Sequence, residues 1–365
     1  MAEPINLQTD VVRQHTVPRF LLKHFSTPGK GKRLRLYAFD KAAGRAYATT
    51  PDDATVRNTF YNLDDHPQRL SLEPLLGIYE HEAAPVIADL LRHKDIRQLT
   101  ADDRYKLAVF VAVQRARTFG ELERISGMIS VLFSKMAAMG ATEEQAGETL
   151  GLSPGGDNRD VFLRQLVQQI SHIDHLLNKD WYLLETKPEH PFYVSDNPVV
   201  LENRNDFGPY GNIGLAVLGI QIYLPLSSTL MLAMYCPSIR EQKIRDKQDL
   251  HHLLARAPHL IPRHMRPFEM LRHLSRFTDY HLMPLTADHV THYNALQVEY
   301  AEQYVFCGEN DFSLVERMLA DDDRYRTGPR FMFQGKFRPA LCREMPVADP
   351  ADHHGTDECC RETPT

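Results

Sequence analysis

The spacing of apolar and polar residues divides the chain into regions with different secondary structure. Residues 33–39 and 45–50 each alternate, and the four-residue turn between them predicts a β-hairpin over 33–50. Before the hairpin, residues 14–25 predict an extended segment, a proline turn and a short helix beginning near Pro18, because proline suits a first helical turn.

A period of 3.6 residues dominates 72–178 and predicts a helical part. Its first helix has an apolar stripe from Leu72 to Leu90 and should kink at Pro85, which removes a backbone hydrogen bond. A second helix should begin after the N-cap Thr100 and continue to about Met139, with a break near Phe119-Gly120. Shorter helices are expected over 141–150 and 160–177.

Strand patterns return in 181–236, which we expect to form a sheet part. Residues 181–186 and 191–196 lie on either side of a turn, and 214–226 should pair with 229–236. A basic segment follows at 239–277, then late helices over 286–304 and 312–319 within a last helical region at 286–320. Residues 321–365 form a polar extension that we expect to be disordered beyond about 345.

The helices and strands are grouped rather than alternating, which favours an α+β fold over a doubly wound sheet. We therefore predict a single large domain over 11–320. It would contain an N-terminal β-hairpin, a central helical bundle, an antiparallel sheet region and C-terminal helices, and a disordered tail would follow.

Composition and charge limit the function. The 365 residues are 43% hydrophobic and 25% charged, which is ordinary for a soluble protein with a large core. The net charge of -6 excludes a global basic field. Local basic stretches at 11–45 and 239–276 favour an anionic partner such as phosphate or RNA, and the alternative is solvated surface.

Targeting signals are missing from the pattern. The first residues lack a basic then apolar leader, and no run approaches 18 apolar residues, so we expect no membrane span. Five cysteines without regular spacing predict a reduced, cytoplasmic setting. The chain also has no P-loop, GxSxG, HExxH or GxGxxG pattern.

Two short cassettes carry most of the candidate chemistry: QHTVPRFLLKHF at 14–25 and SDNPVV at 195–200. In the first, His15 lies beside a proline turn and can serve as a base or a ligand, or can simply cap the turn. In the second, Asp196 ends a strand, where a carboxylate can reach a ligand or bond its own backbone in an Asx-turn.

Polar residues also interrupt the apolar face of the second predicted helix. Gln114, Thr118 and Glu121 share one stripe with apolar residues, and Arg117 lies on its shoulder. An inward arginine needs a carboxylate or an anionic ligand. These polar residues form either an anion or metal site, or a structural network that reaches the Asp196 turn. On the preceding helix, Glu80 is the best inward acid.

Together these residues resemble a widespread, mainly bacterial family, the domain of unknown function 4238 family, over roughly 14–310. The resemblance rests on Gln14, His15, Val17, Pro18, Phe25, the 36–45 hairpin, Phe60-Tyr61, Glu73, Glu80, Gln114, Arg117, Thr118, Ser195 to Pro198, Pro225-Leu226 and Asn294. One position departs from the family pattern, where Phe119 replaces a proline. The family implies no settled activity.

The leading functional hypothesis is a metal-dependent hydrolase or nuclease that acts on a phosphate-bearing substrate. The catalytic and metal-binding set would be His15, Glu80 and Asp196, and Mg²⁺ or Mn²⁺ suits such oxygen-rich ligands. The substrate would be held by Gln114, Arg117, Arg19 and Asn197. The alternative is a non-enzymatic RNA- or protein-binding regulatory or defence protein whose polar cluster is structural.

Overall fold

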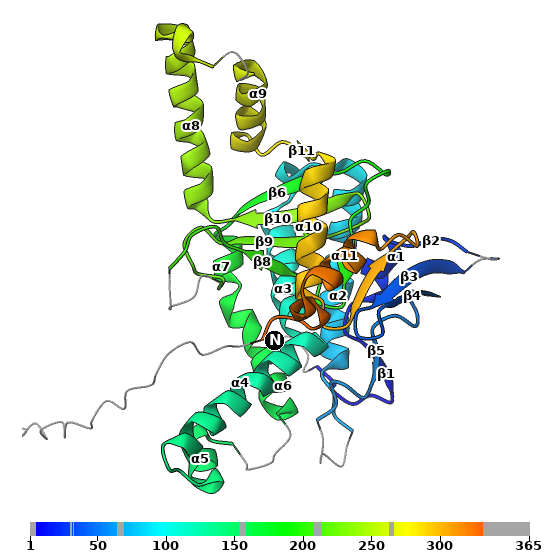
Figure 1. Ribbon diagram of the computed structural model, residues 1–365. Coiled ribbons are helices and arrows are strands. Elements are labelled where there is room, and N and C mark those ends of the chain that lie inside the picture. The colour runs from blue at the N-terminus through cyan, green and yellow to red at the C-terminus, as the bar shows by residue number, and fades with distance from the viewer. Residues whose placement is uncertain are drawn as a thin grey trace, which may run out of the picture. The chain divides into compact units, whose positions relative to one another are not determined.

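The computed structural model describes residues 5–29, 31, 33–63, 69–152, 158–207, 213–262 and 266–330. The chain up to Phe331 forms one unit, which includes the predicted domain 11–320. The tail expected beyond about 345 lies outside the described residues. Helices and mainly antiparallel strands occupy separate stretches, so the predicted α+β class is confirmed (Figure 1).

The first cassette begins with strand β1 (Arg13–His15), which pairs with β5 (Val56–Asn58) in a two-stranded sheet. Helix α1 (Arg19–Lys23) follows the proline turn, and Leu21 and Leu22 are buried in the core. The predicted hairpin is confirmed as β3 (Leu34–Asp40) and β4 (Arg45–Thr49).

Strand β3 belongs to a sheet that joins distant parts of the chain. Its order is β2 (Thr27–Pro28), β3, β12 (Tyr304–Cys307) and β7 (Val194–Ser195), and β4 pairs with β3. The sequence predicts a helix as far as Tyr304. Helix α10 (Ala287–Tyr300) ends four residues earlier, and Tyr304 is the first residue of β12. Residues 301–304 instead bond to neighbouring segments, which stops the helix.

A second sheet has the order β11 (Met283–Pro284), β6 (Asp180–Glu185), β10 (Leu230–Tyr235), β9 (Gln221–Pro225) and β8 (Val200–Glu202). The predicted pairing of 214–226 with 229–236 is confirmed for β9 and β10. Strands β7 and β8 lie in different sheets although only residues 196–199 separate them. The second cassette therefore passes from one sheet to the other.

The helical part contains α2 (Glu73–His93), α3 (Ala101–Ala116), α4 (Phe119–Ala138), α5 (Glu143–Leu150), α6 (Arg159–Gln168) and α7 (Asp174–Leu177). Helix α2 continues through Pro85. The long second helix is broken at Arg117-Thr118, two residues before the predicted break, because the Thr118 side chain accepts from the Glu121 N–H and caps a new helix. The predicted helix 160–177 is likewise divided.

The basic segment forms two further helices, α8 (Pro237–Arg256) and α9 (Pro267–Thr278). Helix α10 contacts β7 and β8, strands of the two different sheets, and α11 (Ser313–Asp321) packs on α10 (Figure 1). Among the described helices, none combines the length and the apolar character that a membrane span requires.

Close packing at Gly308 predicts an effect on stability. A Cβ atom there would lie 2.7 Å from the backbone oxygen of Phe25, at the end of the first cassette. We expect Gly308→Ala to lower the free energy of unfolding by about 1–3 kcal/mol, since a well-packed interior resists added atoms. Urea unfolding followed by circular dichroism measures this.

The matched control is Gly127→Ala in α4, where a Cβ would meet no atom within 4 Å. This substitution should stabilise the protein by about 0.5–1 kcal/mol, because alanine favours a helix over glycine. Equal effects of the two substitutions would contradict the close contact between Gly308 and Phe25.

Candidate functional site

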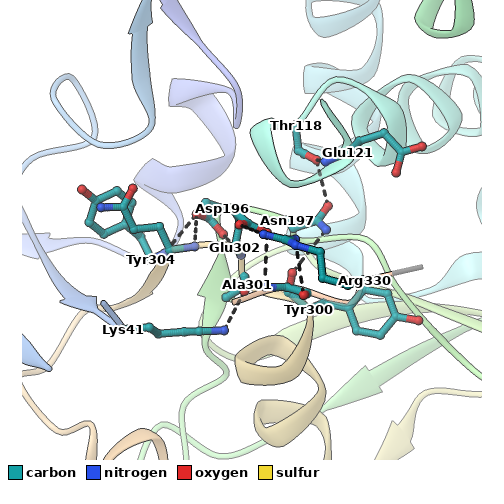
Figure 2. A network of polar contacts seen from close by, with 12 residues as sticks. Lys41, Thr118, Glu121, Asp196, Asn197, Tyr300, Ala301, Glu302, Tyr304 and Arg330 are labelled. Carbon is teal, nitrogen blue, oxygen red and sulfur yellow. Dashed lines mark hydrogen bonds and ion pairs between the residues drawn. The ribbon is translucent and has the colours of Figure 1, made fainter. Parts of the chain in front are cut away.

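The Asp196 carboxylate holds the backbone that links α10 to β12. Its Oδ1 accepts from the Glu302 N–H at 2.8 Å, and its Oδ2 accepts from the N–H groups of Gln303 at 2.8 Å and Tyr304 at 3.0 Å (Figure 2). The Asp196 N–H donates to the Tyr304 oxygen at 3.0 Å. Burial raises the pKa of Asp196 to about 6, although these three donors and Lys41 oppose the shift.

Asn197, the next residue, joins two helix ends. Its Oδ1 accepts from Thr118 Oγ1 at 3.0 Å, and its Nδ2 donates to the Tyr300 oxygen at 3.2 Å (Figure 2). Thr118 caps the start of α4, and Tyr300 is the last residue of α10. The network that the sequence offers as the alternative to a metal or anion site is therefore formed.

Other buried groups complete this network, which we call the turn network. The Lys41 ammonium donates to the oxygens of Val298 at 2.7 Å and Ala301 at 2.6 Å, at the C-terminal end of α10. Burial lowers the pKa of Lys41 to about 8. Gln297 accepts from the Ser195 N–H and hydroxyl and donates to the Pro198 oxygen. Sequence reasoning missed Lys41 and Gln297, because neither belongs to a motif.

The first cassette is held by a second set of contacts, which we call the arginine network. Arg117 is buried, and its guanidinium lies 2.5 Å from Glu80 and donates to the His15 oxygen at 2.7 Å and the Tyr61 hydroxyl at 3.3 Å. Burial opposes the charge on Arg117, but Tyr61 and Glu80 outweigh it and raise the pKa. The carboxylate that a buried Arg117 requires is therefore supplied by Glu80 of the same chain.

The remaining residues of the first cassette are also engaged. Gln14 accepts from the Tyr61 N–H at 2.7 Å and donates to Asn62 Oδ1 at 2.9 Å, and Gln114 donates to the Thr16 oxygen at 3.0 Å. The imidazole of His15 lies 3.3 Å from the Asp52 oxygen, and burial lowers its pKa.

The acidic side chains of Asp52 and Glu73 lie beside these groups. Arg19 pairs with Asp52 at the exposed surface. Glu73, at the start of α2, is largely buried, and its Oε2 has no hydrogen-bond partner among the described residues. Burial raises the pKa of Glu73 to about 7, and Arg117 only partly opposes this. The Glu73 carboxyl beside the arginine network therefore changes its protonation near neutral pH.

A cavity of about 190 Å³ lies beside the turn network. Thr16 and Thr55 line it from the first cassette and the loop before β5, Phe119 from the start of α4, and Asp196 and Tyr304 from the turn network. The segments that carry the family resemblance therefore share one small cavity, although most of their polar side chains point into the networks.

Arg57, on β5, is the unpaired cation of this cavity. Its guanidinium carbon lies 3.5 Å from the centre of the Phe119 ring. The guanidinium has no hydrogen bond or ion pair with any residue in the described ranges. Burial lowers the pKa of Arg57, and the nearby Asp196 counteracts this. Sequence reasoning missed Arg57, and the only signal was Phe119, where the chain departs from the family pattern.

The predicted site residues therefore take different places. Asp196 lines the cavity, whereas His15, Gln114 and Arg117 are bound behind it, Glu80 is paired with Arg117, Arg19 is at the surface and Asn197 lies in the turn network. Within the part of the chain that the structure describes, no three His, Cys, Asp or Glu side chains are grouped as metal ligands.

The fold and the site define an α+β protein with two polar networks and, beside the turn network, a small cavity lined by Arg57. A family model described as a protein of unknown function, DUF4238, matches residues 13–311, and the chain belongs to this family. The resemblance predicted from the cassettes is confirmed. No curated protein and no solved structure matches the chain.

The contacts of Asp196 predict a large effect on stability. Asp196→Asn should lower the free energy of unfolding by about 2–4 kcal/mol. The asparagine NH₂ group would replace one carboxylate oxygen and would face backbone N–H groups that need an acceptor. Asp249→Asn, an exposed change in α8, should alter it by less than about 0.5 kcal/mol. A loss below about 1 kcal/mol for Asp196→Asn in urea unfolding would contradict the proposed holding role.

Glu73 predicts a pH dependence. Its pKa is 4.5 in the unfolded chain and about 7 in the fold, so the folded state binds more protons between these values. Stability should therefore fall as pH rises through this window. Glu73→Gln cannot titrate. Its free energy of unfolding should match wild type near pH 4.5 and exceed it by about 1–3 kcal/mol at pH 8.

The control for this pH profile is Glu82→Gln, an exposed change on the same helix, which should follow wild type at every pH. The measurement is urea unfolding of the three proteins between pH 4.5 and 8. A constant difference between Glu73→Gln and wild type across this range would show that Glu73 does not titrate as its burial implies.

Proposed function

We propose that this chain binds a small phosphate-bearing ligand in the cavity lined by Arg57 and Asp196, with Arg57 holding the phosphate. The observation that carries this proposal is the guanidinium of Arg57, which lies in the cavity without an acceptor among the described residues. Partly buried donors need acceptors, and a guanidinium matches the paired oxygens of a phosphate.

The geometry of Arg57 supports an anion beside it. The guanidinium carbon lies over the Phe119 ring, and a contact with a ring face leaves the N–H groups of an arginine available for an anion. The hydroxyls of Thr16, Thr55 and Tyr304 belong to residues that line the same space. The hydroxyls of Thr16 and Thr55 already donate to the backbone oxygens of Thr55 and Val17, so the ligand oxygens would depend mainly on Arg57.

The size of the cavity favours a small ligand. At about 190 Å³ it is below the usual range of about 300–1,000 Å³ for drug-sized molecules. A phosphate monoester with a short organic part is a better match than a nucleic acid strand. Rigid walls support binding, because both networks fix their side chains before the ligand arrives.

Hydrolysis of the ligand is the second candidate, and one observation favours it: the Asp196 carboxylate lines the same cavity as Arg57. That carboxylate already accepts three N–H groups, and Glu80 is paired with Arg117. Mg²⁺ or Mn²⁺ would have to use the remaining lone pairs of Asp196 together with ligand oxygens. The contacts therefore support binding more strongly than metal-dependent cleavage.

Replacing Arg57 tests the binding. Isothermal titration with inorganic phosphate, glycerol phosphate and glycerol should show binding of the two anions and none of glycerol. Arg57→Met, which keeps an apolar stem over Phe119, should weaken anion binding at least about tenfold, since charge-assisted bonds contribute about 1.5–3 kcal/mol. Arg57→Lys should give an intermediate affinity, because it keeps the charge without the paired donors.

The matched control is Arg45→Met, an exposed arginine on β4, which should bind like wild type. Failure of wild type to bind either anion, or equal binding by Arg57→Met, would overturn the proposal. Glycerol phosphate, labelled RNA and labelled DNA, each with Mg²⁺ or Mn²⁺, test the second candidate. Cleavage by wild type that is lost in Arg57→Met would establish hydrolysis at this cavity, and no cleavage would leave binding as the function.

A further inference from the structure

Helices α8 and α9 form an antiparallel hairpin that the networks and the cavity do not use (Figure 1). At its base, Arg240 donates to the Thr278 oxygen at 2.9 Å and Lys247 to the Thr278 hydroxyl at 3.2 Å. Leu250 and Leu274 are buried in the hairpin but belong to neither core cluster. The outer half of the hairpin is therefore largely independent of the core.

One face of α9 carries an aromatic ring followed by two cations. Phe268, Arg272 and Arg276 are each four residues apart, so they lie about 6 Å from one another along the helix. Phe268 is 74% exposed, more than any other large apolar residue in the described ranges. The guanidinium groups of both arginines form no hydrogen bond or ion pair with a described residue.

The two arginines also line a cavity that reaches the edge strand β11. It measures about 590 Å³ and is lined by Ser275, Arg272, Arg276, Asp279, His281, Leu282, Pro284 and Glu185. Glu185 lies 2.6 Å from the Lys94 ammonium, so its charge is balanced, and Asp279 is the remaining acid. Pro284 on the edge strand β11 has no N–H, which disfavours docking of an added strand.

We infer that this face of α9 binds single-stranded nucleic acid. The ring of Phe268 would stack on one base, and Arg272 and Arg276 would contact the phosphates that follow. Aromatic rings beside a basic groove are the usual means of binding unpaired strands without sequence preference. Residues 249–279 contain five arginines and three acids, and this basic excess gives the charge complementarity that a phosphate backbone requires.

A bilayer or a protein partner explains these observations less well. Both arginines lie in a groove rather than on a plane, and a lipid surface is best met by a continuous apolar face. Stacking also distinguishes the partners, since a base needs an aromatic ring whereas lipid and protein contacts accept an aliphatic side chain.

Fluorescence anisotropy with labelled 20-nucleotide oligo-U and oligo-dT tests the inference on the full chain. Wild type should bind both, with affinity falling as salt rises. Arg272→Gln/Arg276→Gln should weaken binding at least about tenfold and reduce the slope of log K against log salt by about 1.4, at about 0.7 per phosphate. The control Arg45→Gln/Arg164→Gln removes the same charge from exposed positions elsewhere and should keep wild-type affinity.

The aromatic contact is tested separately. Phe268→Leu should weaken binding about tenfold, because leucine has no ring to stack on a base. Phe268→Tyr should keep the affinity, because it keeps an aromatic ring. Absence of oligonucleotide binding by wild type, or wild-type affinity in the double glutamine variant, would overturn the inference. So would equal binding by Phe268→Leu, or binding to anionic vesicles alone. These outcomes are independent of Arg57, so they leave the proposed cavity ligand untouched.

Discussion

The acceptance of three consecutive backbone N–H groups by the Asp196 carboxylate is the interaction on which the rest of this structure depends. It directs the chain from the end of α10 into β12, and β12 pairs with both β3 and β7. The N-terminal hairpin and the second cassette meet in one sheet only because this segment lies between them. An N–H group left unpaired here would be buried without solvent to replace the bond.

The buried polar groups fix the positions of chain segments more than they add to the free energy of unfolding. Asp196, Lys41 and Arg117 are all buried charges, and the desolvation of such groups offsets much of their attraction. What the networks provide is a fixed geometry, since each donor has a defined acceptor. The wall of the Arg57 cavity that Asp196 and Tyr304 form is therefore fixed by the turn network.

The regular elements could be predicted from the sequence because they follow local patterns, as in the 33–50 hairpin and the α5 helix that ends at Gly151. The errors arose where tertiary contacts override local preference. Thr118 begins a new helix because its side chain caps it, and 301–304 leaves the helix because Asp196 and Lys41 capture its backbone. Arg57 could not be found, since a single arginine in a short strand carries no pattern.

The same reasoning explains why the motif residues and the candidate ligand contact are different residues. A side chain that can carry chemistry also makes strong structural bonds, and His15, Glu80, Gln114 and Arg117 all take part in such bonds. A group whose donors are already used has little left for a ligand. The reactive capacity of this site lies with the neighbours that the networks hold but do not satisfy, and Arg57 over Phe119 is such a group.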